Sequence, residues 1–243
     1  MLPTVPAAPP SRAIVIGSSG GIGAALERAL AARGFAVTGL SRSQGGGQAG
    51  DEQPIDLGSE ASIEAAALRL RDQAPFTHIL ITTGLLHDAG VAPEKALREL
   101  DQASLMRLFA INAVGPALVA KHFVPLLPRH GRCVFAALSA RVGSIGDNRL
   151  GGWYGYRASK AALNMFIKTL AIELARTRPQ AICVALHPGT VDTGLSKPFQ
   201  KAVAPGRLFS PDQAAAHLLD VIDQLTPAQT GRCFAWNGAE IEP

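Results

Sequence analysis

Short runs of branched apolar residues alternate along the chain with longer segments in which apolar residues recur every three or four positions. Such runs, bounded by glycine or polar residues, are typical of strands buried on both faces of a parallel sheet, and the longer period is typical of amphipathic helices. The runs predict seven strands, at residues 13–17, 35–41, 53–57, 77–83, 131–138, 181–187 and 231–236. The longer period predicts helices at about 21–34, 59–73, 94–123 in more than one piece, 155–176 and 211–224. This alternation predicts an α/β fold with one doubly wound, seven-stranded parallel sheet and helices on both faces.

No break in composition or internal repeat divides the 243 residues, so we expect one domain over residues 13–243. The Pro-rich segment 1–12 lacks an apolar core of signal-peptide length, and we expect it to be a flexible lead-in. With 47% hydrophobic and 17% charged residues, the composition is globular rather than disordered. Lys and Arg are scattered despite a net charge of +4, which gives no indication of a nucleic-acid partner.

The three cysteines and six histidines show no spacing typical of a metal site, so we expect no metal. Cys133, Cys183 and Cys233 all fall in predicted strands, and we expect them to be reduced core residues. No uninterrupted apolar run reaches membrane-spanning length, so we also expect no membrane association. Together these features predict a cytoplasmic protein.

The segment IVIGSSGGIGAAL places Gly17, Gly21 and Gly23 between the first predicted strand and the first predicted helix. A turn without side chains lets a pyrophosphate approach the backbone, and a helix N-terminus offers free N–H groups and the positive end of its dipole. A glycine-rich loop alone fits a structural turn equally well, and the spacing G-x-x-x-G-x-G differs from G-x-G-x-x-G. The position between a buried strand and an amphipathic helix favours dinucleotide binding.

Arg42 follows the second predicted strand, where dinucleotide-binding folds that use NAD carry an acidic residue. The next acidic residue here is Asp51. A guanidinium donates two parallel hydrogen bonds to a phosphate, so Ser41 and Arg42 favour NADP, with its 2′-phosphate, over NAD. The alternative is an arginine exposed in a loop.

Tyr156 and Lys160 are separated by one helical turn and therefore share a helix face. An ammonium group near a phenol favours the phenolate, which predicts a lowered pKa for Tyr156 and a role in proton transfer. Tyr154 has Ala158 at the same offset and lacks such a partner. Taken alone, Y-x-x-x-K is common on solvated helix faces, so it gains weight only from the glycine-rich turn upstream.

Five motifs follow one another in the order typical of the short-chain dehydrogenase/reductase family. They are IGSSGGIG (16–23), NAVG (112–115), Ser139, YRASK (156–160) and PGTVDT (188–193). The chain resembles this family over nearly its whole length, and the stretch around Tyr156 is similar to its C-factor-type and carbonyl-reductase-like branch. The resemblance implies a single-domain Rossmann fold and a nicotinamide cofactor.

The resemblance also implies residue roles. Tyr156 would be the general acid/base, Lys160 would hold the nicotinamide ribose, and Ser139 would hydrogen-bond the substrate oxygen. Asn112 would hold a water molecule that links Lys160 to solvent, Thr193 would bind the nicotinamide carboxamide, and Asp56 and Leu57 would flank the adenine. The implied cofactor-binding residues are Gly17, Ser18, Ser19, Gly21, Ile22, Gly23, Ser41, Arg42, Asp56, Leu57, Thr83, Gly84, Tyr156, Lys160, Pro188, Gly189, Val191 and Thr193.

The chain departs from the family pattern at three places. The N-N-A-G motif after the fourth strand is replaced by TTGL (82–85), and Ile16 stands where the family carries threonine. The family places its serine about 13 residues before the tyrosine, whereas Ser139 lies 17 before Tyr156 and Ser144 lies 12 before it. Ser139 is favoured because it directly follows the fifth predicted strand, but Ser144 stays an alternative.

These features predict an NADP-dependent oxidoreductase acting on a small carbonyl or alcohol substrate. The alternative is a non-catalytic, cofactor-binding signalling protein of the C-factor type. The segment from about 195 to 209 is expected to form the substrate lid, and pairing into a homodimer or homotetramer is possible within the family. Trp153 and Tyr154 are candidates for the pocket wall or for simple packing, with Tyr154 the favoured wall residue. Arg141 is either a loop charge or an anchor for an anionic substrate.

Overall fold

Seven parallel strands form the centre of the protein in the computed structural model, which describes residues 11–42 and 53–243. Their order across the sheet is β3-β2-β1-β4-β5-β6-β9, so the chain runs outward from β1 to β3 and then crosses back to β4 on the other side of β1. The bounds are β1 Arg12–Ile16, β2 Ala36–Ser41, β3 Gln53–Pro54, β4 His78–Ile81, β5 Cys133–Leu138, β6 Ala181–His187 and β9 Cys233–Ala235. This confirms the predicted doubly wound, seven-stranded parallel sheet.

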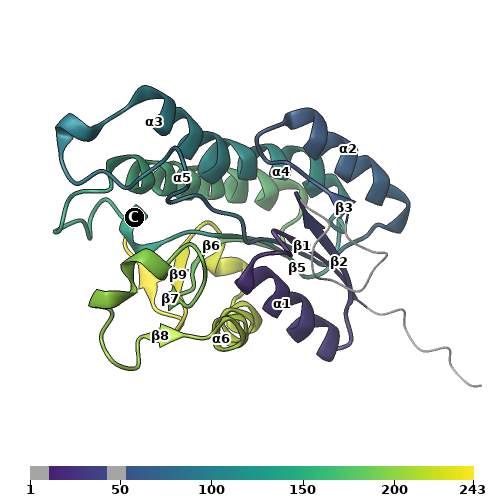
Figure 1. The fold of residues 1–243 in the computed structure, drawn as a ribbon. Coiled ribbons are helices and arrows are strands. Elements are labelled where there is room, and N and C mark those ends of the chain that lie inside the picture. Colours follow the sequence, from purple (N-terminus) through teal and green to yellow (C-terminus); the bar gives the residue numbers. More distant parts are fainter. Residues whose placement is uncertain (1–10, 43–52) are drawn as a thin grey trace, which may run out of the picture.

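Helices cover both faces of this sheet (Figure 1). One layer holds α2, α3, α4 and α5, and the opposite layer holds α1 and α6. The bounds are α1 Gly21–Ala32, α2 Glu60–Leu70, α3 Gln102–Phe109, α4 Gly115–Phe123, α5 Tyr154–Thr177 and α6 Pro211–Gln224. Gly34 follows α1 with a φ of 83° and stops the helix, as predicted.

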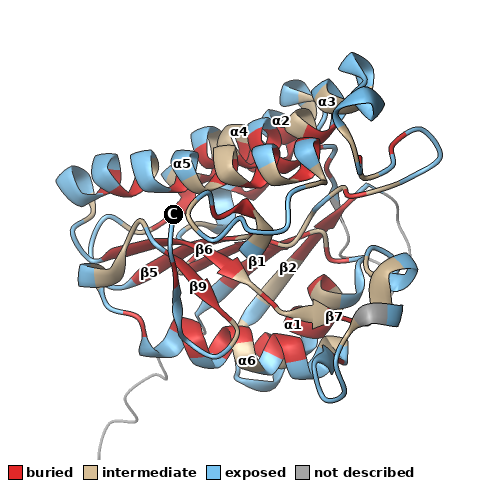
Figure 2. Cartoon of the chain, turned by 90° about the vertical axis from the view of Figure 1, so that its left-hand side faces the viewer, coloured by how far each residue is buried: buried red, intermediate tan, exposed pale blue. Residues whose placement is uncertain are grey.

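The sheet is buried between the two helical layers (Figure 2). Successive residues of β1 point to opposite faces: Ile14 and Ile16 pack in the cluster beneath α2, α4 and α5, and Ala13 and Val15 pack with α1 and α6. All three cysteines are buried in strands, as predicted. Burial on both faces explains why the strands read as continuous apolar runs.

Three short strands were not predicted from the sequence. β10 (Glu240–Ile241) pairs antiparallel with β9 at the sheet edge, and β7 (Thr190–Val191) pairs with β8 (Leu208–Phe209) in a separate two-stranded sheet. Each has only two residues, too few to show a periodicity. β1 begins at Arg12, one residue before the expected domain boundary. Residues 1–10 of the expected lead-in and the glycine-rich loop 44–50 lie outside the described residues.

The long helical region predicted at 94–123 consists of several pieces, as expected. A short 3₁₀ turn at Leu97–Glu99 precedes α3, and a π-helical segment, Ala110–Val114, joins α3 to α4. The continuous stretch Gln102–Leu126 is nevertheless long and apolar enough, by length and composition, to cross a membrane. It is not an uninterrupted apolar run, because Arg107 and Lys121 lie within it. Here it packs against α2 and α5 through buried residues such as Val119 and Phe123, as a core helix does.

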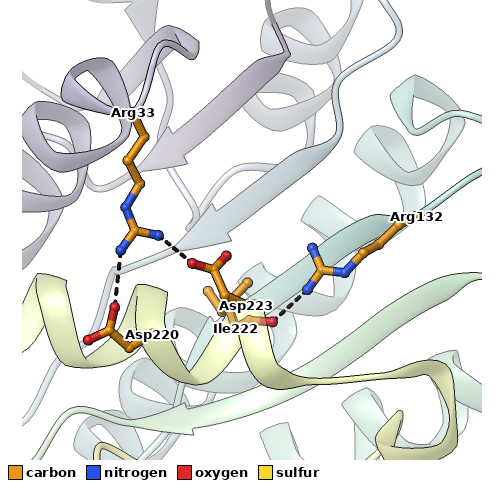
Figure 3. A network of polar contacts seen from close by, with 5 residues as sticks. All are labelled: Arg33, Arg132, Asp220, Ile222 and Asp223. Carbon is orange, nitrogen blue, oxygen red and sulfur yellow. Dashed lines mark hydrogen bonds and ion pairs between the residues drawn. The ribbon is translucent and has the colours of Figure 1, made fainter.

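A polar network ties the two helices of the α1 and α6 layer together at the edge opposite the strand carboxyl ends (Figure 3). Arg33, which caps the C-terminus of α1, forms ion pairs with Asp220 and Asp223 of α6 at 3.2 and 2.7 Å. Arg132, just before β5, donates to the carbonyl oxygen of Ile222 at 2.6 Å. Most of these groups are well exposed, so the network contributes little to stability and mainly fixes the position of α6 relative to α1 and β5.

Candidate active site

A cavity of about 790 Å³ lies at the carboxyl ends of the parallel strands, where the loops after β1, β2, β4, β5 and β6 meet. Ligands of doubly wound sheets bind at this edge, next to the point where the strand order reverses. Most of the sequence-predicted site residues line this cavity: Gly17, Ser19, Gly21, Ile22, Gly23, Ser41, Arg42, Asp56, Leu57, Thr83, Gly84, Ser139, Tyr156, Lys160, Pro188 and Thr193.

The glycine-rich turn is closed so tightly that it has no room for side chains. A Cβ added at Gly23 would lie 2.2 Å from the carbonyl oxygen of Gly17, and one at Gly17 would lie 2.7 Å from Thr82 Oγ1. Gly17 also has a φ of 94°. The turn therefore brings bare backbone and the N-terminus of α1 to the cavity, as an anionic pyrophosphate requires.

Two threonines show how this chain builds the loop after β4 without the N-N-A-G motif. Thr82 Oγ1 donates to the carbonyl oxygen of Ile16 at 2.9 Å and so ties the loop to the glycine-rich turn. Thr83 Oγ1 is buried at the cavity wall and has no hydrogen-bond partner among residues 11–42 and 53–243. An unpaired buried hydroxyl is unfavourable, so Thr83 fits a site whose ligand supplies the missing hydrogen bond.

Tyr156 and Lys160 lie on the first two turns of α5 and are almost fully buried in the cavity wall. Lys160 Nζ donates to the carbonyl oxygen of Leu138 at 2.8 Å and lies 5.8 Å from the centroid of the Tyr156 ring. Within the described part of the chain, one of the three ammonium N–H donors is thus used, and the others are left for a ligand.

Burial, rather than the neighbouring ammonium, controls the proton affinity of both groups. It raises the pKa of Tyr156 to about 12 and lowers the pKa of Lys160 to about 8. The prediction that Lys160 lowers the pKa of Tyr156 is therefore wrong for the protein without ligands. The sequence shows the spacing of the two groups but not the dry surroundings, whose effect is larger. At neutral pH Tyr156 is a protonated phenol, which is the form that donates a proton.

The two candidate serines have different surroundings. Ser139 lines the cavity directly after β5, where its backbone N–H donates to the carbonyl oxygen of Leu186 at 2.8 Å. Its hydroxyl donates to Asn164 Oδ1 at 2.7 Å. Ser144 is buried outside the cavity wall, and its Oγ accepts from the backbone N–H of Asp147 at 3.0 Å. The structure therefore brings Ser139, and not Ser144, to Tyr156 and Lys160.

Asn112 lies in the π-helical segment, fully buried behind the cavity rather than in its wall. Its Oδ1 accepts from the backbone N–H of Leu85 at 2.7 Å, and its Nδ2 donates to the carbonyl oxygen of Leu85 at 2.7 Å and to Ser159 Oγ at 3.1 Å. Both amide protons are therefore used. The side chain fastens the loop after β4 to α5, and π-helical turns often occur at such positions.

Three predicted cofactor residues lie outside the cavity wall. Ser18 is buried, next to Gly39 of β2, where an added Cβ would come within 3.0 Å of the Ser18 Cβ. Gly189 has a φ of 79° and leaves room for the Phe209 ring, 2.7 Å from where its Cβ would be. Val191 is buried in β7. All three residues shape neighbouring backbone segments. A sequence motif does not show whether a residue has such a structural role or contacts the ligand.

Several cavity residues were missed by the sequence reasoning. They are Gly20, Ile55, Gly58, Thr82, Leu85, His87, Asp88, Arg107, Ala110, Ile111, Leu138, Gly194 and Leu195. Arg107 and Asp88 form an ion pair at 2.5 Å, and His87 Nε2 lies 3.1 Å from the carbonyl oxygen of Leu195 across the cavity. The helical spacing of Arg107, Ala110 and Ile111 was the one available signal, because it puts them on one face.

A left-handed turn precedes α5. Gly151, Gly152 and Trp153 have φ values of 64°, 64° and 53°, and Trp153 is the one non-glycine residue with positive φ in the described chain. Arg157 donates to the carbonyl oxygens of Gly152 and Gly151 at 2.9 and 3.1 Å and holds the turn. Glu94 fastens its end, since its carbonyl oxygen accepts from the Trp153 N–H at 2.5 Å.

This turn places the Trp153 ring against Tyr156 and against Phe199 of the segment after β7, with ring centroids 6.2 and 5.0 Å apart. Trp153 therefore packs behind the cavity wall. Tyr154 is 42% exposed and does not line the cavity, so its assignment to the pocket wall is wrong. The helix turns it away from Tyr156. Arg141 lies outside the wall as well and forms an ion pair with Asp147 at 3.0 Å.

The described residues contain no group of three or more His, Cys, Asp or Glu side chains placed to hold a metal ion. The cavity wall combines a glycine-rich turn with a tyrosine, a lysine and a serine.

Comparison with known proteins agrees with this arrangement. The short chain dehydrogenase family profile matches residues 11–204. The chain is 34% identical to 1-hydroxy-2-glutathionyl-2-methyl-3-butene dehydrogenase of Rhodococcus sp. over 228 residues, which cover 91% of this chain and 95% of the relative. It is 37% identical to the C-signal protein of Myxococcus xanthus over 159 residues, covering 65% of this chain and 90% of that one.

Among solved structures, the fold resembles that of NADPH-bound carbonyl reductase from chicken fatty liver. The TM-score is 0.82 at 22% identity, with 96% of this chain and 94% of the other covered. At this identity the likeness concerns the fold. The extent of the family match, with the near-complete coverage of the Rhodococcus relative, shows that the chain belongs to the short-chain dehydrogenase family.

Proposed function

We propose that this protein is an NADP-dependent oxidoreductase that transfers a hydride between nicotinamide and a small carbonyl or alcohol substrate. The observation that carries the proposal is that Tyr156, Lys160 and Ser139 line the same cavity as a glycine-rich helix N-terminus. The arrangement offers a proton donor and a hydroxyl to a substrate oxygen, with a cation next to the proton donor.

The cavity fits a dinucleotide in three respects. The turn at Gly17, Gly21 and Gly23 is bare enough for a pyrophosphate, the buried Thr83 hydroxyl lacks a partner, and Lys160 has unused N–H donors. Arg42 at the cavity end of β2 supports NADP, as does the NADPH bound to the chicken carbonyl reductase. Lys160 and Thr83 would hold the nicotinamide end, and Arg42 would hold the 2′-phosphate.

When bound, the nicotinamide supplies the hydride that adds to the carbonyl carbon. Tyr156 donates its proton to the carbonyl oxygen, and solvent water restores that proton afterwards. Lys160, with a pKa of about 8, is mostly cationic at pH 7 and stabilises the tyrosinate left behind. Ser139 donates a hydrogen bond to the oxygen as negative charge develops on it. Asn112 keeps the loop after β4 against α5.

The proposal is tested by measuring NADPH oxidation at 340 nm with a panel of aldehydes, ketones and quinones, in parallel with the reverse reaction on alcohols. Turnover of at least one class is expected. The alternative is a non-catalytic cofactor-binding signalling protein, which is considered because one relative is named C-signal. NADPH binding by calorimetry without turnover in either direction would support that alternative, and absence of binding would overturn both.

Replacing Arg42 with alanine should weaken NADPH binding about 10- to 100-fold and leave NADH binding nearly unchanged. The reason is that the guanidinium contacts the 2′-phosphate, which NADH lacks, and a hydrogen bond to a charged group contributes about 1.5–3 kcal/mol. Calorimetric titration of both cofactors measures the effect. Arg28→Ala is the matched control, because Arg28 lies on the exposed face of α1 and forms an ion pair with Asp212 of α6. An equal loss for both cofactors would contradict the assignment.

The substrate is proposed to be a small molecule, with the segment from Leu195 to Phe209 next to its entry. A homodimer or homotetramer, a cytoplasmic location and the absence of nucleic-acid and membrane partners stay predictions.

A further inference from the structure

The functional face of α5 extends one turn beyond Tyr156 and Lys160. Asn164 follows Lys160 at the same four-residue interval, so the three side chains form one row along the helix. Asn164 is half-buried and does not belong to the residues that line the cavity. It contacts Ser139, the serine that lines the cavity together with Tyr156 and Lys160.

The direction of the Ser139 hydroxyl is set by this contact. Ser139 is 4% exposed, and its backbone is fixed by the hydrogen bond from its N–H to Leu186. Its O–H donates to Asn164 Oδ1 at 2.7 Å. A hydroxyl has a single proton, so in this arrangement Ser139 offers lone pairs, and not a donor, to the cavity.

A substrate oxygen that gains negative charge needs donors around it. A side-chain amide carries an acceptor on one side and a donor group on the other, and rotation about its last bond exchanges them. After this rotation Asn164 Nδ2 donates to Ser139 Oγ, and the serine proton is free to point into the cavity. The contact between the two side chains keeps one hydrogen bond in both states.

We propose that Asn164 is a positioning residue that sets the direction of the Ser139 hydroxyl proton, with its amide rotating when a substrate oxygen arrives. The proposal rests on the proposed function, because only a substrate oxygen that gains negative charge requires the serine proton to turn into the cavity. It assigns to Asn164 a role through Ser139 and no contact with substrate or cofactor.

The test is Asn164→Asp. A carboxylate accepts from Ser139 but cannot donate to it, so the serine O–H stays directed toward the introduced carboxylate and away from the cavity. With the serine O–H still covalently intact but held toward the carboxylate, we expect kcat for carbonyl reduction to fall about 100-fold at neutral pH, with KM for NADPH unchanged. As the pH is lowered, the introduced carboxyl group gains a proton and becomes a donor, so kcat relative to wild type should rise. Asn164→Leu, which can neither accept nor donate, should show a smaller loss that does not depend on pH.

Two controls separate this role from a structural one. Asn237→Asp makes the same change of charge at an exposed loop position and should leave kcat and its pH profile unchanged. In a Ser139→Ala background, Asn164→Asp should cause little further loss, because the residue acts through the serine. An undiminished further loss, or a pH-independent effect of Asn164→Asp, would overturn the proposal.

A second measurement keeps the proposal separate from the proposed function. The side-chain amide NMR signals of Asn164, identified by their loss in Asn164→Asp, should shift in Ser139→Ala, because Oδ1 loses its donor. If wild type shows no turnover but this shift occurs, the proposed function fails and the hydrogen bond stands. If wild type shows turnover but the Asn164 amide signals do not shift in Ser139→Ala, the proposed role of Asn164 is wrong and the proposed function is unaffected.

Discussion

Tyr156→Phe should reduce turnover about 10³-fold while NADPH affinity and Tm stay close to those of wild type. The substitution removes only the hydroxyl that would donate the proton. The ring keeps its contacts with the cluster of Leu86, Val91 and Leu108. No described residue hydrogen-bonds the hydroxyl, so its loss leaves no buried partner unsatisfied. Steady-state kinetics, calorimetric titration with NADPH and thermal melts measure the three quantities.

Tyr154→Phe is the matched control for this experiment. It removes the same atom from the other tyrosine of the chain, two residues away on the same helix, where the side chain is exposed. It should leave turnover unchanged. If Tyr156→Phe retained more than a tenth of wild-type turnover, another group would have to supply the proton, and the assignment of Tyr156 would be wrong.

Lys160→Met should lower turnover about 100-fold and weaken NADPH binding, yet raise the free energy of unfolding at pH 7. Burial lowers the pKa of Lys160 from 10.5 to about 8, which means that the folded protein binds this proton less tightly than the unfolded chain. The buried ammonium therefore destabilises the wild type, and methionine fills a similar volume without a charge. The same residue would then favour function and oppose stability.

The lowered pKa of Lys160 also determines how the stability difference between wild type and Lys160→Met changes with pH. Between pH 8 and 10.5 the unfolded chain holds more protons at this position than the folded protein, so wild-type stability rises with pH through that window. Below pH 8 both states are protonated, and the full penalty applies. Urea denaturation should therefore show the stability advantage of Lys160→Met at pH 7 and its decline by pH 10. Lys168→Met, at an exposed position of α5, should show neither effect.

The fold was largely predictable because parallel strands buried on both faces leave continuous apolar runs. The strand β6 begins and ends at its predicted residues, Ala181 and His187, for this reason. Glycine and proline marked the helix ends at Gly34 and Pro211. The two-residue strands β7, β8 and β10 depend on which segments meet in space, and their sequences carry no local pattern.

The candidate site was predictable where one short segment carries the chemistry, as at Gly17–Gly23 and Tyr156–Lys160. It was not predictable where segments distant in sequence meet. His87 lines the cavity in contact with Leu195, which lies 108 residues further along the chain. The raised pKa of Tyr156 reflects burial that spacing alone cannot reveal.

The serine spacing is a clear example of the same limit. The residues between Ser139 and Tyr156 include a short 3₁₀ turn, Arg141–Gly143, and the left-handed turn at 151–153. Sequence distance from the tyrosine therefore says little about which serine reaches the cavity. The position at the end of β5 was the better guide, because a parallel strand delivers the residue after it to the ligand edge.

The left-handed turn before α5 also gives the protein a built-in optical reporter. The chain has two tryptophans, and the turn holds Trp153 between Tyr156 and Phe199, whereas Trp236 packs on Phe209 and His217. With Trp236 replaced by phenylalanine, the tryptophan fluorescence would come from Trp153 alone. Movement of the Phe199 segment could then be followed in real time without a label, and its rate compared with that of turnover.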